Sequence, residues 1–300
     1  MTKRAPVNQK TFSAWLALLP LFILVVGFTF FPLIKILFIG LGKTVQPFQI
    51  NSFALLVKDA NFRQALKNTL ILCLGVVPAS LVIGFFLAWA VSEVRLLRPV
   101  WRTIYLLPLA SGFVGLTILM QGLFQFRQGL MNEGLKLGGW TVRHWLQIPT
   151  AANAAFMVTV LIQGLGLSFV IFVAKIRTLQ HRQAIYQLAA IDGASPRQQL
   201  RYVTLPALKT TFWVVLLVEL MFVLQLFDQA YIFFNHHLVS QHLGFTLTYY
   251  VYQTFWQQHN YQLAVAAALV LMGLMVLGMI IPLCCLKKHP RNFTPQIKAL

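Results

Sequence analysis

Five polar side chains that could bind a hydroxyl-rich solute lie inside long apolar stretches of this sequence. They are Gln163, Ser168, Glu219, Gln225 and Asp228. Ionisable groups in apolar surroundings are costly, so they usually face the interior of a helix bundle or a wet cavity. A cavity lined by these side chains would exchange hydrogen bonds with the hydroxyl groups of a sugar or another polyol. The alternative is that they hydrogen-bond one helix to another and touch no solute.

Catalytic and metal-binding patterns are missing from the sequence. No Ser/His/Asp or Cys/His arrangement can be assembled, because the acids nearest to a histidine lie within apolar stretches. The cysteines Cys73, Cys284 and Cys285 have neither metal-ligand spacing nor a plausible disulfide framework. We therefore expect this chain to be no enzyme and to bind no metal and no cofactor of its own.

The composition of the chain is that of a membrane protein. Hydrophobic residues make up 58% of its 300 residues and charged residues only 10%, whereas a soluble domain carries about 25% charged residues. Six apolar segments reach the roughly 20 residues that a helix needs to cross a bilayer. They cover residues 14–39, 69–91, 104–126, 152–174, 211–234 and 260–286. The sequence predicts an all-α polytopic membrane protein with one transmembrane domain over residues 1–300.

The distribution of positive charge predicts the orientation of these six segments. Lys and Arg are far more frequent in the connections on the side of the N-terminus than on the opposite side. Because cytoplasmic loops carry this excess, both termini are predicted to be cytoplasmic. The net charge of +18 does not indicate nucleic-acid binding, since the basic residues form short clusters between apolar segments.

Aromatic residues gather just before the last apolar segment. Aromatic rings can stack on sugars, but tyrosine and tryptophan also form belts at the two membrane–water interfaces. The sequence favours the belt for this group, which comprises Tyr249, Tyr250, Tyr252, Phe255 and Trp256.

The longest polar connection, residues 175–210, predicts two short helices joined by a turn. Residues 183–191 are rich in helix formers, and Asp192-Gly193 ends that helix because glycine tolerates backbone angles that other residues avoid. A second helix then starts with Ser195 as N-cap, Pro196 in the first turn and Gln198 in the capping-box position.

Leu205-Pro206 is predicted to end or kink this second helix. A helical hairpin of this kind buries little apolar surface, and the small residues at its turn let another backbone approach closely. Such a hairpin suits docking against a partner protein. The alternative is a basic loop held near the membrane by lipid headgroups.

The segment from Tyr186 to Ala194 resembles the cytoplasmic “EAA” loop of bacterial ABC importer permeases. Its sequence YQLAAIDGA is similar to the family pattern lyEAAxiDGA, and Leu205-Pro206 matches the continuation of that pattern. Further motifs of the carbohydrate-type branch occur in family order over most of residues 15–285. They are Ala65 to Leu70 (al.NTl), Leu107-Pro108 (lP), Gly129 to Asn132 (GliN) and Phe227 to Tyr231 (FDxvy).

The chain departs from the family pattern at several positions. The family glutamate is Gln187 here and the next alanine is Leu188, so a salt bridge at position 187 is not expected. The Ile-Pro that usually precedes the loop is absent. The Gly-Gly-Pro that usually follows FDxvy is replaced by residues 235–238.

The resemblance implies a permease subunit of an ATP-driven importer, similar to maltose and sugar permeases, in the bacterial plasma (inner) membrane. Residues 183–206 would couple it to a separate ATPase through Tyr186, Gln187, Ala189, Ala190, Asp192, Gly193, Ala194, Pro196, Arg197, Leu205 and Pro206. Its implied partners are a second permease subunit, two ATPase subunits that use ATP and Mg, and an extracytoplasmic solute-binding protein. One rival hypothesis is an ion-coupled secondary transporter that uses Glu219 or Asp228, and another is a membrane scaffold that transports nothing.

Overall fold

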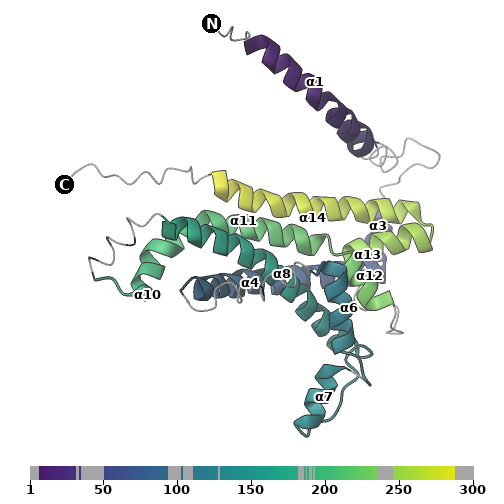
Figure 1. Cartoon of the computed structure of the whole chain (residues 1–300). Helices are drawn as coiled ribbons and strands as arrows, with labels where there is room; N and C mark the ends of the chain where they lie inside the picture. The colour runs from purple at the N-terminus through teal and green to yellow at the C-terminus, as the bar shows by residue number, and fades with distance from the viewer. Residues whose placement is uncertain are drawn as a thin grey trace.

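The computed structural model of the chain is built from helices (Figure 1). It describes residues 7–31, 34, 51–93, 103, 111–127, 129–181, 186, 188, 191, 193–235 and 246–287. Every regular element within these ranges is helical, and none of them is a strand. The prediction of an all-α protein is confirmed for this part of the chain.

Long helices form the body of the molecule. They are α4 (Ala60–Glu93), α8 (Pro149–His181), α11 (Leu205–Leu224) and α14 (Tyr261–Lys287). α11 lies beside α14 and also contacts α4 and α8 (Figure 1). Among the described residues, these 4 helices are long and apolar enough to cross a membrane, α11 together with the turn before it. α4, α8 and α14 contain or coincide with three of the predicted segments.

The predicted segment 211–234 is wrong as a single helix. α11 ends at Leu224, residues 225–227 leave the helical conformation, and α12 (Asp228–Asn235) begins there. The carboxylate of Asp228 lies in the first turn of α12, where a helix favours negative charge. Composition concealed this break, because residues on both sides of it are apolar.

Shorter helices make up the rest of the described structure. α1 (Val7–Val25) continues as the π-helix η1 (Val26–Phe30), and α6 (Phe113–Leu123) covers part of the predicted segment 104–126. Residues 104–110 of that segment lie outside the described residues. The remaining short elements are α3 (Asn51–Lys58), α7 (Leu130–Leu137), α10 (Pro196–Gln199), η2 (Leu200–Thr204), α13 (Leu247–Tyr252) and η3 (Gln253–Gln257).

Closely packed aromatic rings hold together the end of the body from which the polar loop projects. Phe85 of α4, Phe172 of α8 and Phe212 of α11 approach one another with ring centroids 4.8 to 5.7 Å apart. Ile176 and Leu208 pack in the same cluster and are essentially inaccessible. Such close packing is resistant to deformation. It therefore fixes the direction in which the chain leaves α8 and returns into α11.

Candidate functional site

The turn of the polar loop has the backbone conformation that the sequence predicts. Gly193 has φ +74°, in the left-handed region that side chains with a Cβ rarely adopt. A Cβ at this position would meet no described atom within 4 Å, so the turn stands open to its surroundings. The backbone angle, and not crowding by the described residues, therefore favours glycine at position 193.

The second helix of the loop starts with the predicted capping box. The backbone N–H of Ser195 donates to Oε1 of Gln198 at 2.8 Å, and the backbone N–H of Gln198 reaches Oγ of Ser195 at 3.4 Å. The side-chain amide of Gln199 donates to the carbonyl of Ala194 at 3.1 Å. These bonds satisfy backbone groups that the helix start would otherwise leave unpaired. They give the turn a defined shape without any partner protein.

The predicted end or kink at Leu205-Pro206 is a change of helix type. The chain stays helical from α10 through η2 into α11, with Pro206 in the first turn of α11. Proline lacks the N–H of the regular helical bond, and the wider π turn of η2 lies immediately before it. The loop is therefore joined to α11 by continuous helix, which can transmit a displacement of the loop.

A hydrogen bond ties the two arms of the loop together. The hydroxyl of Tyr186 lies 3.0 Å from Oγ1 of Thr204, and Thr204 is buried. Of the other predicted coupling residues, Gln187, Ala189, Ala190 and Asp192 lie outside the described residues. Pro196 and Arg197 are in the described backbone of α10.

The loop exposes apolar side chains that sequence reasoning did not select. Leu188 is 59% exposed, Ile191 80% and Tyr202 70%. The guanidinium of Arg201 lies 5.8 Å from the ring centroid of Tyr202. Large apolar groups on a polar loop are costly to leave in water, and they mark a surface that another protein can cover. Their position among charged and small residues was the signal available in the sequence.

Ser168 and Glu219, two of the predicted polar residues, meet inside the body. The hydroxyl of Ser168 on α8 donates to Oε1 of Glu219 on α11 at 2.7 Å, and both residues are fully buried. Oε2 of Glu219 has no hydrogen-bond partner among the described residues and lies against Gly164, where a Cβ would be only 2.6 Å away. This geometry matches the alternative in which these groups join two helices.

Small residues bring α4 and α8 close together beside this carboxyl group. Ser80 and Gly84 on α4 face Gly164 and Ser168 on α8, and each pair is spaced four residues apart. A Cβ on Gly84 would lie 2.6 Å from the Cβ of Ser168. Paired small residues at this spacing allow close packing of membrane helices. The buried carboxyl is therefore surrounded by tightly packed backbone.

Gln163 hydrogen-bonds to α6 and not to the carboxyl group of Glu219. Its amide nitrogen donates to the carbonyl of Phe113 at 3.0 Å and to Oγ1 of Thr117 at 3.1 Å, both on α6. Its Oε1 is buried and has no partner in the part of the chain that the structure describes. Gln163 thus joins α8 to α6, whereas Ser168 joins α8 to α11.

Gln225 lies in the break between α11 and α12, Asp228 is the first residue of α12, and both are exposed. Hydroxyl groups at the start of α13 donate hydrogen bonds to carbonyls that the break leaves without helical partners. The hydroxyl of Thr248 donates to the carbonyl of Leu224 at 2.9 Å, and that of Thr246 to the carbonyl of Leu226 at 2.7 Å. In membrane transporters, solute sites often lie where spanning helices are discontinuous. Two exposed polar side chains at a stabilised break fit such a site.

The predicted aromatic belt is wrong for two of its tyrosines. Tyr249 and Tyr250 are buried, and the hydroxyl of Tyr250 donates to Oδ2 of Asp59 at 2.6 Å. Burial, together with this hydrogen bond to Asp59, raises the pKa of Tyr250. Phe255 and Trp256 remain exposed, as a belt requires. Tyr250 instead holds α13 against the turn between α3 and α4.

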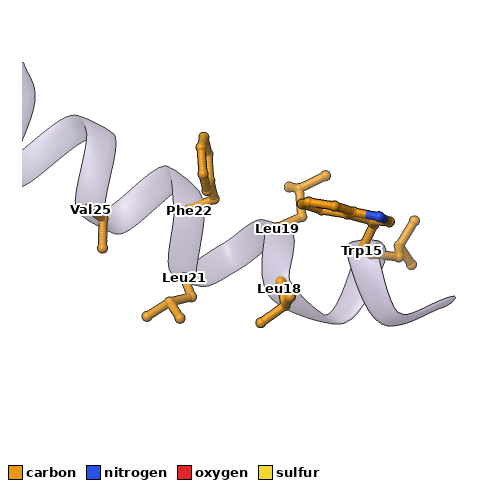
Figure 2. Close-up of a pocket in the computed structure, with 7 residues that line it drawn as sticks. Trp15, Leu18, Leu19, Leu21, Phe22 and Val25 are labelled. Carbon is orange, nitrogen blue, oxygen red and sulfur yellow. The ribbon is translucent and has the colours of Figure 1, made fainter. Parts of the chain in front are cut away.

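An apolar hollow on α1 is unsuited to a polar solute. Figure 2 shows side chains from successive turns of one helix, including Trp15, Leu18 and Phe22. Trp15 and Phe22 are each 67% exposed, and the lining residues of this hollow offer almost no polar surface. This hollow is suited to contact with lipid tails.

Groups of three or more potential metal ligands are absent from the described residues.

Comparison with known families decides the class of the chain. Residues 80–283 match the model of the family described as “binding-protein-dependent transport system inner membrane component”. The chain belongs to this family. The matched range includes both arms of the loop, the buried carboxyl and the break after α11.

Individual members of this permease family are similar over most of their length. A Pyrococcus horikoshii protein described as a “probable ABC transporter permease protein” is 30% identical over 271 residues, which are 87% of this chain and 91% of that protein. The lactose transport system permease protein of Rhizobium radiobacter is 26% identical over 270 residues, covering 87% of this chain and 90% of the relative.

A solved structure confirms the permease fold. It is that of a bacterial alginate ABC transporter in complex with an alginate pentasaccharide-bound periplasmic protein. The likeness has a TM-score of 0.77 at 22% sequence identity and covers 92% of this chain and 93% of the other. This chain is accordingly an ABC importer permease in fold and in family, and a membrane protein.

Proposed function

We propose that this chain is the transmembrane permease subunit of an ATP-driven importer for a sugar or related polyol, coupled to a separate ATPase through residues 183–206. Its partners are a second permease chain, two ATPase subunits that consume ATP and Mg, and an extracytoplasmic solute-binding protein. It lies in the bacterial inner membrane with six spans and both termini in the cytoplasm. The chain itself hydrolyses nothing.

The observation that carries this proposal is the construction of the loop. The open left-handed turn at Gly193 is fixed by the capping box that follows it. Ile191, beside the turn, is 80% exposed. The loop continues through η2 into α11, which holds Glu219 and ends at the break. An ATPase that displaces the loop would therefore also displace α11, because continuous helix connects the two.

The proposed solute class rests on the relatives and on the polar groups at the break. The relatives include a lactose permease and an alginate transporter, both of which carry carbohydrates. Gln225 and Asp228 are exposed beside the break and supply an amide and a carboxylate for solute hydroxyls. In this proposal they contact the solute, while Gln163, Ser168 and Glu219 hold the helices that frame the pathway.

The six-span topology is supported by two further apolar helices. Besides the 4 long helices, the described residues include the shorter apolar helices Leu18–Phe30 and Phe113–Leu123. These lie within the predicted segments 14–39 and 104–126, each of which has one end outside the described residues. The charge distribution then places residues 183–206 in the cytoplasm, where an ATPase can reach them.

Substitution of Gly193 tests the coupling role. Gly193→Val adds bulk and forces a β-branched residue into the left-handed region, whereas Gly193→Asn tolerates that region and adds only the side chain. We expect both variants to assemble with their partners and to lose solute uptake, because the ATPase must approach this backbone closely. Uptake is measured in membranes that contain matched amounts of complex.

The matched control is Gly139→Asn, since Gly139 has φ +72° and no described atom within 4 Å of its Cβ position. This control carries the same substitution at an equally open glycine turn and should keep uptake. Normal uptake by Gly193→Val would refute the coupling role of the loop. If Gly193→Val lost uptake while Gly193→Asn kept it in full, coupling would depend only on the conformation of the turn.

A further inference from the structure

The segment between α6 and α8 projects from the body as a separate hairpin, residues 129–148, which contains α7 (Figure 1). Its surface is unusually apolar for an exposed connection. Leu137 is 90% exposed, Trp140 71% and Leu130 68%. None of these side chains takes part in the proposed docking loop or solute pathway.

One buried asparagine holds the hairpin in shape. The amide of Asn132 donates to the carbonyls of Phe126 and Arg143, each at 3.0 Å. Its Oδ1 accepts from the backbone N–H of Arg143 at 3.2 Å and from Nε1 of Trp145 at 3.0 Å. Asn132 is 1% exposed, so its side chain is both satisfied and enclosed. The two arms of the hairpin are therefore cross-linked through a single side chain.

Glycines fix the two ends of α7. A Cβ on Gly129 would lie 2.2 Å from the carbonyl oxygen of Gln125, so only glycine fits where α7 begins. At the other end Gly139 has φ +72°. Its N–H donates to the carbonyl of Lys136 at 3.0 Å, and the N–H of Trp140 donates to the carbonyl of Leu135 at 2.8 Å. This pair of bonds is the Schellman ending of a helix. It places the backbone of Trp140 at a defined position.

α7 directs its exposed leucines and its lysine to different sides. Leu130 and Leu137 are seven residues apart and share one face of the helix. At about 100° per residue, Glu133 lies at the edge of that face, and Lys136 lies about 100° or more around the helix from both leucines. Glu133 and Lys136 form an ion pair at 2.6 Å. The helix therefore has an exposed apolar face and a separate exposed cation, both held in fixed orientation by the frame around Asn132.

We propose that this hairpin lies in the membrane–water interface, with Leu130, Leu137 and Trp140 inserted at the boundary between lipid headgroups and acyl chains. α7 has 8 residues, about 12 Å at 1.5 Å per residue, too short to span a bilayer. It follows α6 and precedes the membrane-spanning α8, so it is tethered at the membrane surface. Tryptophan at its tip suits the headgroup level.

The charges around α7 favour a lipid surface as the occupant. Arg127, Lys136 and Arg143 are exposed, and Glu133 is the acid that accompanies them. Cationic side chains beside an exposed apolar face are typical of helices that lie on anionic bilayers. A rigid hairpin anchored in this way would hold the adjoining ends of α6 and α8 at a constant depth while other parts of the permease move.

Spin labels on different sides of α7 test this placement. The full-length chain, purified with the subunits that accompany it, carries a single cysteine after Cys73, Cys284 and Cys285 are replaced by alanine. Leu137→Cys and Leu130→Cys report the apolar face, and Lys136→Cys is the control on a different side of the same helix. The complexes are reconstituted in vesicles of phosphatidylcholine and phosphatidylglycerol. Collision rates are measured with oxygen, which concentrates in lipid, and with a water-soluble nickel chelate.

The proposal predicts that labels at 137 and 130 collide with oxygen several-fold more often, relative to the nickel chelate, than the label at 136. Equal access of the nickel chelate to both faces would overturn it, because the hairpin would then stand in water. Exclusion of both reagents from 137 and 130 would also overturn it, since a protein partner would then cover this face. If Leu137→Cys does not assemble, Leu130→Cys gives the same comparison.

Discussion

Gly84→Ala tests whether α4 and α8 pack as closely as the structure shows. A Cβ at position 84 would lie 2.6 Å from the Cβ of Ser168 and 3.5 Å from the backbone nitrogen of Phe169. Carbon atoms normally meet at about 3.5–4.0 Å, so the overlap is about 1 Å. The Cβ of Ser168 is bonded directly to the backbone of α8, and no rotamer change can move it away. The two helices must therefore separate.

The size of the effect follows from three contributions. Overpacking of a close interface costs about 1–3 kcal/mol. Separation also weakens the hydrogen bond from Ser168 to Glu219, and such bonds in membrane proteins contribute about 0.6 kcal/mol on average. Alanine offsets part of this loss, because it favours a helix by about 1 kcal/mol over glycine. We expect Gly84→Ala to destabilise the folded chain by about 2 kcal/mol.

Unfolding in mixed detergent micelles, titrated with dodecyl sulfate and followed by tryptophan fluorescence, measures this change. Gly273→Ala is the matched control in α14, because no described atom lies within 4 Å of its Cβ position. The control should lose no stability. Ser168→Gly removes the opposing Cβ, so the double variant should be more stable than the sum of the single effects predicts. Strict additivity, or equal stability of the Gly84 and Gly273 variants, would refute the close packing.

Three further substitutions have defined expectations. Ser195→Ala removes the N-cap of the docking loop, costs that helix about 1 kcal/mol and should lower uptake only mildly; complete loss of uptake would contradict this cap role. Glu219→Gln should reduce the yield of assembled complex and leave uptake affinity unchanged, whereas a change in affinity would place Glu219 in the solute pathway. Burial and the hydrogen bond to Asp59 raise the pKa of Tyr250 above its ordinary value of 10.0. The stability that its hydroxyl contributes to the fold is therefore complete below pH 10 and is lost as the pH rises further. Tyr250→Phe should therefore be less stable by about 1 kcal/mol at pH 8 and lose less stability between pH 10 and 12, and identical pH profiles would exclude the effect.

Features encoded by neighbouring residues were predictable from the sequence. The turn at Gly193 and the capping box of Ser195 with Gln198 depend on residues within one helical turn of each other, and the structure confirms both. The long apolar helices were equally clear, because bilayer thickness sets their minimum length. The loop motif, together with the order and spacing of the other motifs, indicated the family.

Features that depend on distant partners were not predictable in the same way. The break after Leu224 is stabilised by the hydroxyls of Thr246, the N-cap of α13, and of Thr248 within α13. The pairing of Ser168 with Glu219 joins positions 51 residues apart in the chain. The burial of Tyr250 depends on Asp59, 191 residues away. Hydropathy and spacing carry no record of which helices become neighbours, so these contacts emerged only from the fold.

The energy source of transport is the most direct test of the central claim. The tagged chain is purified from native membranes together with its accompanying subunits, identified by mass spectrometry, and reconstituted with the solute-binding protein in vesicles. Our account predicts a second permease chain and an ATPase among those subunits. It also predicts that solute uptake requires ATP and Mg on the side of the membrane that carries residues 183–206. Uptake should persist when ionophores collapse all ion gradients. Uptake that continues without any ATPase and stops when an ion gradient is dissipated would contradict the account and identify an ion-coupled carrier.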